Sequence, residues 1–180
     1  MMITALLFST ILSAHSADTI NKKLSEKDLT IQGITIGKTT LNELKEKYKN
    51  KEIYHQGDEA ESVFLLCYKT SSGTIAFESK DPGAEHLINA VSINGAGVPY
   101  HHNVCEKTSG FKGKLSIYNL SLGMSPDLIK TVKGKPSKAE NDYLEYNFAA
   151  DGAVSDLKIK FKNSAVSEIK LSTANGSEHK

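Results

Sequence analysis

A short pattern of residues occurs twice in this chain. The string "LTIQGITIGKT", Leu29 to Thr39, aligns without gaps with "LSIYNLSLGMS", Leu115 to Ser125. Leu, Ile and Gly recur at the first, third and ninth positions, and a Thr or Ser occupies the second, seventh and eleventh positions of both strings. Such internal similarity predicts two copies of one structural unit.

Both copies are followed by signals for a short helix. After the second copy, Ser125 is a natural N-cap and Pro126 suits the first helical position. After the first copy, Thr40 and Glu43 match a capping box, in which each side chain accepts a hydrogen bond from the other residue's backbone N–H. We therefore expect a helix after each copy. The lead-in segments 29–36 and 115–122 fit either a strand or a helical turn.

After each predicted helix the apolar residues recur with a period of two, which indicates strands. In the second half, this alternation occurs in "YLEYNF", "LKIKFK" and "EIKL". The corresponding candidate strands of the first half are "SVFLLCYK", "GTIAFES" and "HLINAVSI". A helix followed by an antiparallel meander, twice over, predicts an α+β fold. We expect two tandem repeats, each with a helical segment packed on a three- or four-stranded antiparallel sheet.

These elements divide the chain into five parts. We expect a signal peptide at 1–17, the first helix-plus-sheet repeat at 18–98 and the second at 115–172. The Gly, Pro and Ser content of the segment Asn94 to Lys114 is typical of a connection, and residues 99–114 are expected to form a linker. The polar residues 173–180 are expected to be a disordered tail.

The N-terminal segment has the features of an export signal. Ile3 to Leu12 is an apolar run interrupted only by small or hydroxyl residues, and Ala14 and Ser16 fit the small-x-small cleavage pattern. The run is too short to span a bilayer, and no Cys follows it that would carry a lipid. A buried N-terminal strand or helix is the alternative. The sequence predicts a periplasmic or secreted protein without a lipid anchor or a transmembrane helix.

The chain has two cysteines, Cys67 and Cys105. A pair of cysteines in an exported protein is usually oxidised, and two cysteines allow only one pairing. We therefore expect a disulfide between them, with two reduced structural thiols as the alternative.

The composition argues against two classes of function. The 22 basic and 21 acidic residues nearly balance, and every basic residue is Lys. Because bidentate recognition of phosphates and base edges is mainly the work of Arg, we expect no nucleic-acid partner. The chain has no Gly-x-Ser-x-Gly motif and no other motif that holds a nucleophile beside a base. We expect neither an enzyme nor a bound cofactor.

A histidine pair provides the alternative site. His101 and His102 lie close to Cys105, and with His86 or His55 they would offer ligands that suit zinc. Adjacent histidines rarely ligate the same ion, however, and the predicted disulfide would use Cys105. We expect solvated loop histidines and no metal. A periplasmic protein that binds a metal or small ligand at this loop is the alternative function.

The most distinctive surface feature is a row of lysines. Lys158, Lys160 and Lys162 alternate with apolar residues, so a strand would project all three from one face. Tyr143 and Glu145 would share that face if the neighbouring strands are in register. One interpretation is an ordinary solvated sheet face. The other is a cationic surface that docks an acidic protein partner or an envelope polymer, with Tyr143 adding contact area.

The string "LSLGMSPDLIKTVKGKPSK", residues 120–138, resembles the small BamE-like (SmpA/OmlA) domains of outer-membrane assembly lipoproteins. In that family an apolar residue precedes Gly-Met-Ser/Thr, and a short helix closes at Gly-x-Pro. Two such units in an exported chain are also similar to the β-lactamase inhibitory protein-like fold, whose paired sheets grip an enzyme. The resemblance implies a non-catalytic protein-binding module that uses a sheet face, either an envelope interaction protein or an inhibitor-like protein.

Overall fold

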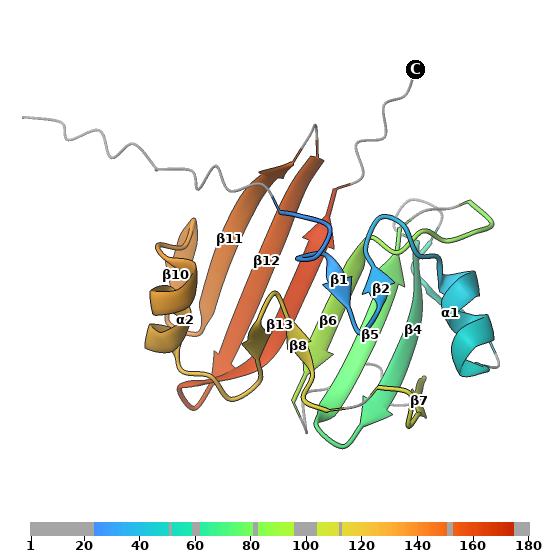
Figure 1. The fold of residues 1–180 in the computed structure, drawn as a ribbon, viewed down its shortest axis with the longest axis horizontal. Coiled ribbons are helices and arrows are strands. Elements are labelled where there is room, and N and C mark those ends of the chain that lie inside the picture. The colour runs from blue at the N-terminus through green and yellow to red at the C-terminus, as the bar shows by residue number, and fades with distance from the viewer. Residues whose placement is uncertain are drawn as a thin grey trace, which may run out of the picture.

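The computed structural model describes residues 24–50, 52–58, 62–80, 83–95, 104–111, 113–150 and 153–174. The predicted signal peptide lies outside these residues. Of the described residues, 48% are in strands and 12% in helices. The predicted α+β fold, with a helix-on-sheet unit in each half, is therefore wrong. The protein is mostly β and is built on one nine-stranded sheet (Figure 1).

The elements follow one another along the chain in the order β1 (Thr30–Ile31), β2 (Ile34–Thr35), α1 (Leu41–Tyr48), β3 (Tyr54–Gln56), β4 (Val63–Thr70), β5 (Gly73–Ser79), β6 (Ala90–Asn94), β7 (Cys105–Lys107), β8 (Ser116–Ile117), β9 (Leu120–Ser121), α2 (Pro126–Lys133), β10 (Lys138–Glu140), β11 (Tyr143–Ala150), β12 (Ala153–Lys162) and β13 (Ala165–Thr173).

A single sheet runs across the whole molecule. Its strand order is β10-β11-β12-β13-β6-β5-β4-β3, and β7 pairs in parallel with β4 at one edge. In the centre, β13 pairs antiparallel with β6, so that Ile169 lies opposite Ile93 and Leu171 opposite Val91. This pairing joins the strands of the second half to those of the first. Two separate sheets of three or four strands, as predicted, therefore do not form.

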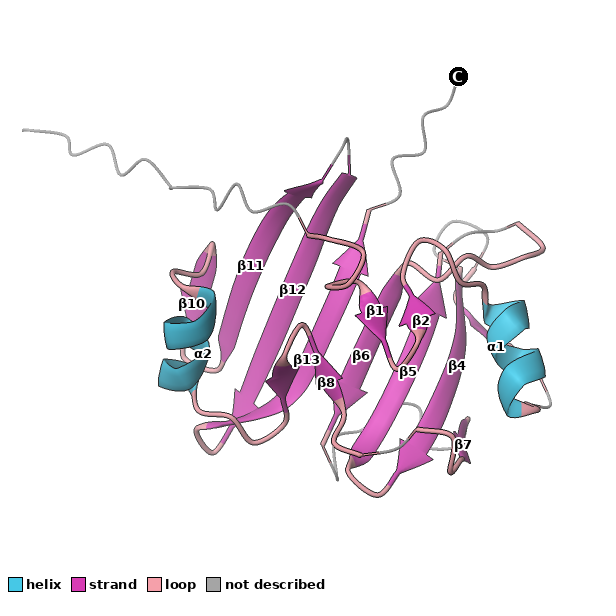
Figure 2. Cartoon of the chain, viewed as in Figure 1, coloured by secondary structure: helices cyan, strands magenta, loops and turns pink. Residues whose placement is uncertain are grey.

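The helices contribute little to the core, which is the physical reason why the α+β prediction fails. Each helix has only eight residues. Leu41 and Leu44 of α1 are buried, but in α2 only Ile129 is. Leu128 and Val132 of the same helix are 46% and 52% exposed. In two turns a helix offers few positions to an apolar face, so paired strands supply most of the buried surface (Figure 2).

The helix starts follow the predicted caps. The backbone N–H of Glu43 donates to Thr40 Oγ1 at 3.1 Å, and the N–H of Thr40 donates to the Glu43 carboxylate at 2.8 Å. The predicted capping box is thus confirmed. At α2 the N–H of Leu128 donates to Ser125 Oγ at 3.3 Å, with Pro126 at the start of the helix, as predicted.

The two lead-in segments contain short β-hairpins. In the first hairpin, β1–β2, Ile31 lies opposite Ile34, and in the second, β8–β9, Ile117 lies opposite Leu120. All four of these residues are buried in the main core. Both hairpins lie in front of the sheet in Figure 1. The order hairpin, helix and four strands therefore occurs in both halves of the chain, as β1 to β6 and as β8 to β13.

The predicted disulfide between Cys67 and Cys105 is confirmed, with a Cα–Cα distance of 4.4 Å. The two residues lie directly opposite each other in β4 and β7. Part of the segment 99–114, predicted as a linker, is thus a strand at the sheet edge. The three residues of β7 are held by their pairing with β4 and by the disulfide. A buried disulfide is consistent with an oxidising compartment.

Removing this disulfide should lower stability markedly. The bond closes a loop with a sequence separation of 38 residues. The chain-entropy model then gives a stabilisation of about 4 kcal/mol. We expect the Cys67→Ala/Cys105→Ala variant to lose about this much free energy of unfolding in a urea titration. The reduced natural protein should behave alike, and a loss of under about 1 kcal/mol would contradict the prediction.

Gly73 has no room for a side chain. Its φ is +137°, and an added Cβ would lie 2.2 Å from the carbonyl oxygen of Asn94. Gly73→Ala should therefore cost roughly 2 kcal/mol or more of stability. Gly95→Ala is the matched control, since its Cβ would meet the Ser167 carbonyl oxygen at an ordinary 3.5 Å. Equal unfolding midpoints for the two variants in urea would show that the close approach is not a constraint.

Candidate functional site

The two faces of the sheet differ in what lies against them. The hairpins and helices pack on one face, where Tyr146, Phe77 and Ile159 belong to the main core. We call the opposite face the open face. Along β11, buried Leu144 and Tyr146 point to the core, and the partly exposed Tyr143, Glu145 and Asn147 point to the open face. No described helix or hairpin lies on the open face, but part of this face is buried, because Leu65, Cys67, Ala76 and Cys105 form a second, smaller core cluster there.

The strand register places the predicted binding residues on this face. Tyr143 lies opposite Lys160, and Glu145 lies opposite Lys158. Lys162 follows a register shift between Lys160 and Phe161 and is exposed at the end of β12. The structure therefore brings Tyr143, Glu145, Lys158 and Lys160 together. Lys162 lies at the margin of this group.

Several charged side chains of the open face are paired with one another. Lys160 Nζ lies 3.0 Å from Glu168 Oε2 on β13. The Tyr143 hydroxyl donates a hydrogen bond to Glu145. Glu168 and Asp156 were missed in the sequence reasoning, although the same alternation in "EIKL" and "DLKIKF" places them beside the lysines. The face is thus mixed in charge and is not purely cationic.

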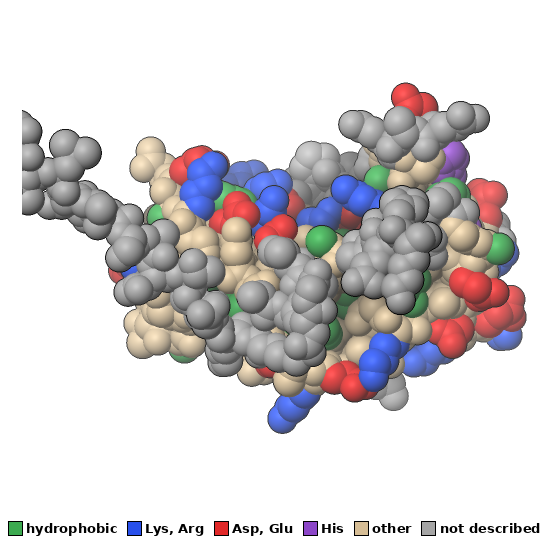
Figure 3. All heavy atoms as spheres, turned by 90° about the horizontal axis from the view of Figure 1, so that it is seen from above, with side chains coloured by type: hydrophobic (Ala, Val, Ile, Leu, Met, Phe, Trp, Pro, Cys, Tyr) green, Lys and Arg blue, Asp and Glu red, His purple; other side chains and the backbone are tan. Residues whose placement is uncertain are grey.

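The side chains of the open face differ in how far they are exposed. One row of neighbours runs across the strands from Lys158 through Lys170, Ser92 and Ala76 to Cys67. Ser92, Ala76 and Cys67 are buried, whereas Lys158 and Lys170 are partly exposed. In Figure 3, Lys and Asp or Glu side chains lie along the upper margin of the molecule.

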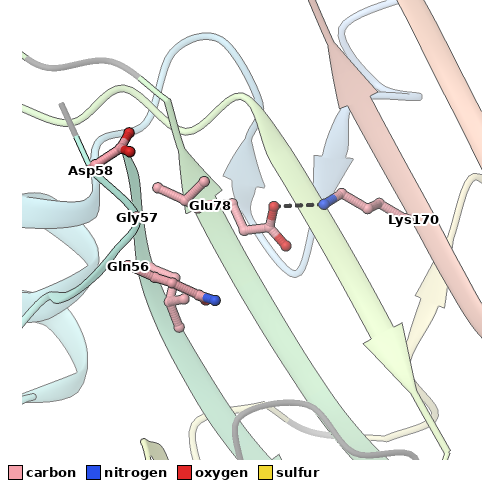
Figure 4. A pocket seen from close by; sticks show the side chains of 7 residues that line it. Gln56, Gly57, Asp58, Glu78 and Lys170 are labelled. Carbon is pink, nitrogen blue, oxygen red and sulfur yellow. Dashed lines mark hydrogen bonds and ion pairs between the residues drawn. The ribbon is translucent and has the colours of Figure 1, made fainter. Parts of the chain in front are cut away.

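A depression of about 390 Å³ lies on the part of this face formed by the first half of the chain. Glu78 of β5 and Lys170 of β13 meet there, with Lys170 Nζ 2.6 Å from Glu78 Oε2 (Figure 4). The Glu78 side chain is only 6% exposed and that of Lys170 is 32% exposed. The residues that line the depression are Gln56, Gly57, Asp58, Val63, Leu65, Glu78 and Lys170.

Some polar atoms of the open face are buried without a hydrogen-bond partner. Among the described residues these are Thr74 Oγ1, Ser92 Oγ, both amide atoms of Asn94 and Asn147 Oδ1. Each such group costs about 1–3 kcal/mol of stability relative to a satisfied one. Departures of this kind from the stablest packing are expected at functional surfaces.

Burial changes the pKa values of Tyr143 and Asp156 on the open face. Burial raises the pKa of the Tyr143 phenol, and its hydrogen bond to Glu145 raises it further. Burial also raises the pKa of the Asp156 carboxyl. For Asp156 the positive charge of Lys158 acts in the opposite direction, and the negative charge of Glu145 adds to the effect of burial.

The Asp156 shift predicts a pH dependence of stability. Because its pKa is raised on folding, the folded protein holds this proton more tightly than the unfolded chain. The resulting stabilisation is full below the ordinary Asp pKa of about 3.9 and is lost as the pH rises through the raised pKa. Across that window, the natural protein should therefore lose stability relative to Asp156→Asn.

Urea titrations at several pH values, beginning below about pH 4, would measure this difference. Asp142→Asn, in the exposed turn before β11, is the matched control. Parallel curves of unfolding free energy against pH for the natural protein and Asp156→Asn would contradict the assignment.

Only part of the alternative histidine site lies within the described residues. His101 and His102 lie outside the described residues. His55 and His86 stack on Phe64, with ring centroids 4.7 Å and 4.0 Å away, and His55 Nε2 is 3.0 Å from Ser62 Oγ. In the described part of the chain, no group of three or more His, Cys, Asp or Glu residues is arranged to hold a metal ion.

No family model matches this chain, and no curated protein or solved structure matches it either. The resemblance of residues 120–138 to BamE-like domains therefore stays a prediction. Neither described helix is long and apolar enough to cross a membrane.

Proposed function

We propose that this protein is a non-catalytic binding module that holds another protein against the open face of its sheet. The observation that carries the proposal is that charged side chains on this face are held in place before any partner arrives. Lys160 is paired with Glu168, Lys170 with Glu78, and the Tyr143 hydroxyl with Glu145. Side chains that are already ordered lose less conformational entropy on binding, which favours association.

The positive charge of the β12 lysines indicates the chemistry of the partner. Lys160 and Lys162 are exposed on β12, and Lys158 lies beside them on the same face. An acidic surface on the partner would be attracted to these lysines and steered toward the sheet. Tyr143, opposite Lys160, would add aromatic contact area at the rim.

We also propose that the protein acts in the periplasm or outside the cell. The disulfide between Cys67 and Cys105 supports this location because such bonds persist in oxidising compartments. The predicted signal peptide at residues 1–17 supports it independently. Both arguments imply that partners should be sought among envelope and extracellular proteins.

Cross-linking would test the proposed face. The oxidised protein is cross-linked in extracts of its own envelope and medium, and captured proteins are identified by mass spectrometry. In the Lys158→Glu/Lys160→Glu/Lys162→Glu variant we expect capture of a dominant partner to fall about tenfold or more, because three favourable contacts become repulsive. The lost pair with Glu168 is on the surface, where such pairs contribute under about 1 kcal/mol, so the variant should fold.

The matched control reverses two lysines on the helices, which lie on the other side of the sheet. Lys47 and Lys130 are both exposed. The Lys47→Glu/Lys130→Glu variant should capture the partner as the natural protein does. Equal capture by the natural protein and both variants would overturn the assignment of the lysine-bearing open face as the binding surface.

A further inference from the structure

The sheet ends at β10, and this end strand carries one charge of each sign. In the strand order β10 has β11 on one side, and no other described strand lies along its outer edge. Lys138 and Glu140 both project from the open face, as their partners Glu145 and Tyr143 do. Lys138 Nζ lies 2.8 Å from Glu140 Oε1, and the two side chains are 61% and 54% exposed.

Ala139, between these two residues, carries the outward backbone groups of the edge. The N–H of Asn147 donates to Ser137 Oγ at 3.0 Å, and the carbonyl oxygen of Glu145 accepts from the N–H of Ser137 at 2.8 Å. The odd-numbered residues of β11 thus direct their backbone groups toward β10. Ala139 lies between the two residues of β10 that pair with them, so its N–H and C=O point away from the sheet.

The sequence of β10, Lys-Ala-Glu, is complementary to itself. In an antiparallel pair of two copies centred on Ala139, Lys138 of each copy lies opposite Glu140 of the other. The two Ala139 residues then exchange N–H to C=O hydrogen bonds. Opposite charges facing each other across two strands are stabilising, and like charges are destabilising. An edge that is protected from pairing typically carries lysines, which repel their own copies, but here the charges of two copies attract.

Beside this edge, helix α2 exposes two apolar side chains, Leu128 and Val132. Ile129 faces the core, and Lys133 Nζ lies 3.3 Å from the centre of the Tyr118 ring in the turn of the β8–β9 hairpin. At about 100° per residue, Leu128 and Val132 lie on the other side of Ile129 from Lys133. In Figure 2, α2 and β10 lie at one end of the molecule and β8 lies toward its centre. The two apolar side chains therefore lie on the outer side of α2.

The corresponding end of the first half differs. The third and seventh residues of α1 are Glu43 and Lys47, where α2 has Leu128 and Val132. The edge strand β3 has the sequence Tyr-His-Gln, without a pair of opposite charges, and β7 extends the sheet beside it. Of the two ends, only that of β10 combines an exposed apolar pair with self-complementary charges among the described residues.

We propose that the β10 edge joins two copies of this chain in a symmetric dimer. The two β10 strands pair antiparallel about Ala139, and the two sheets become one continuous sheet. Leu128 and Val132 of the two copies meet across the twofold axis on the core side of this sheet. A twofold interface uses the same patch on both subunits, and a self-complementary edge meets that requirement.

This dimer does not rest on the proposed function. A twofold axis perpendicular to the joint sheet leaves both open faces on the same side of it. The lysine rows of the two β12 strands then flank the axis, separated from it only by β11 and β10 of each copy. The dimer would thus present the lysine-bearing surface twice.

Sedimentation velocity on the oxidised protein would test the dimer, and we expect a reversible monomer–dimer equilibrium at micromolar concentrations. Lys138→Glu and Glu140→Lys each place like charges opposite one another, so each should weaken the dimer about tenfold or more. The exchange variant Lys138→Glu/Glu140→Lys restores complementarity and should dimerise as the natural protein does. Lys47→Glu, on α1 at the other end of the sheet, is the control and should dimerise normally.

A mixture of the two single variants separates the proposed pairing from any effect on folding. Lys138→Glu makes both charges of β10 acidic and Glu140→Lys makes both basic. The mixture should therefore form a heterodimer that is tighter than either homodimer, which a change in monomer stability would not produce. A natural protein that stays monomeric, or an exchange variant as weak as the single variants, would overturn the proposal and leave the edge to a strand of another protein.

The apolar contact is tested by Leu128→Glu/Val132→Glu. Both side chains are exposed, so this variant should fold with a urea midpoint close to that of the natural protein. We expect its dimer to be weaker by about tenfold or more, because apolar contact is replaced by like charges near the axis. Lys47→Glu again serves as the control, since Lys47 occupies the position in α1 that matches Val132. Dimerisation as tight as that of the natural protein would contradict the interface.

Discussion

The pairing of β6 with β13 is the interaction on which the rest of the structure depends. It extends from Glu168 opposite Asn94 to Ser172 opposite Ala90. On one face it places Ile93 beside Ile169, which makes the core continuous between the two halves. On the other face it places Lys170 beside Ser92, within reach of Glu78 on β5. Without this pairing, the Glu78–Lys170 pair would not exist.

The same pairing fixes two chemically different regions at a set separation. The exposed lysines come from β12, and the carboxylates of the depression come from β5 and from the residue after Gly57. Strands held in one sheet cannot shift by one residue without turning their core side chains outward, so the spacing of these charges is rigid. Rigid spacing allows a surface of mixed charge to recognise one arrangement on a partner and reject others.

Local patterns in the sequence predicted the elements well because their causes are local. The caps at Thr40 and Ser125 and the period-two strands need only neighbouring residues. The sharing of one face by Lys158 and Glu145 also follows from alternation and a tight meander. The pairing of β6 with β13 was missed. The alternation in "AVSIN" shows which residues of β6 face the core, but it does not show which strand pairs with β6. The Glu78–Lys170 pair was missed for the same reason, since Lys170 reaches Glu78 only through that pairing.

The pairing of charges within the open face favours specificity over raw affinity. A partner that covers Lys160 must also cover Glu168, because the two are in contact. A partner that lacks complementary groups would leave both charges without water and without new contacts, which is costly. Ala76, Ala90 and Ser92 at the centre of this face are buried, so contact with a partner falls to exposed side chains such as Lys160 and to the partly exposed Lys158 and Glu168. A bound protein must therefore match the charges on the β12 and β13 part of the face, and the fixed pairing of Lys160 with Glu168 selects which of its residues fit.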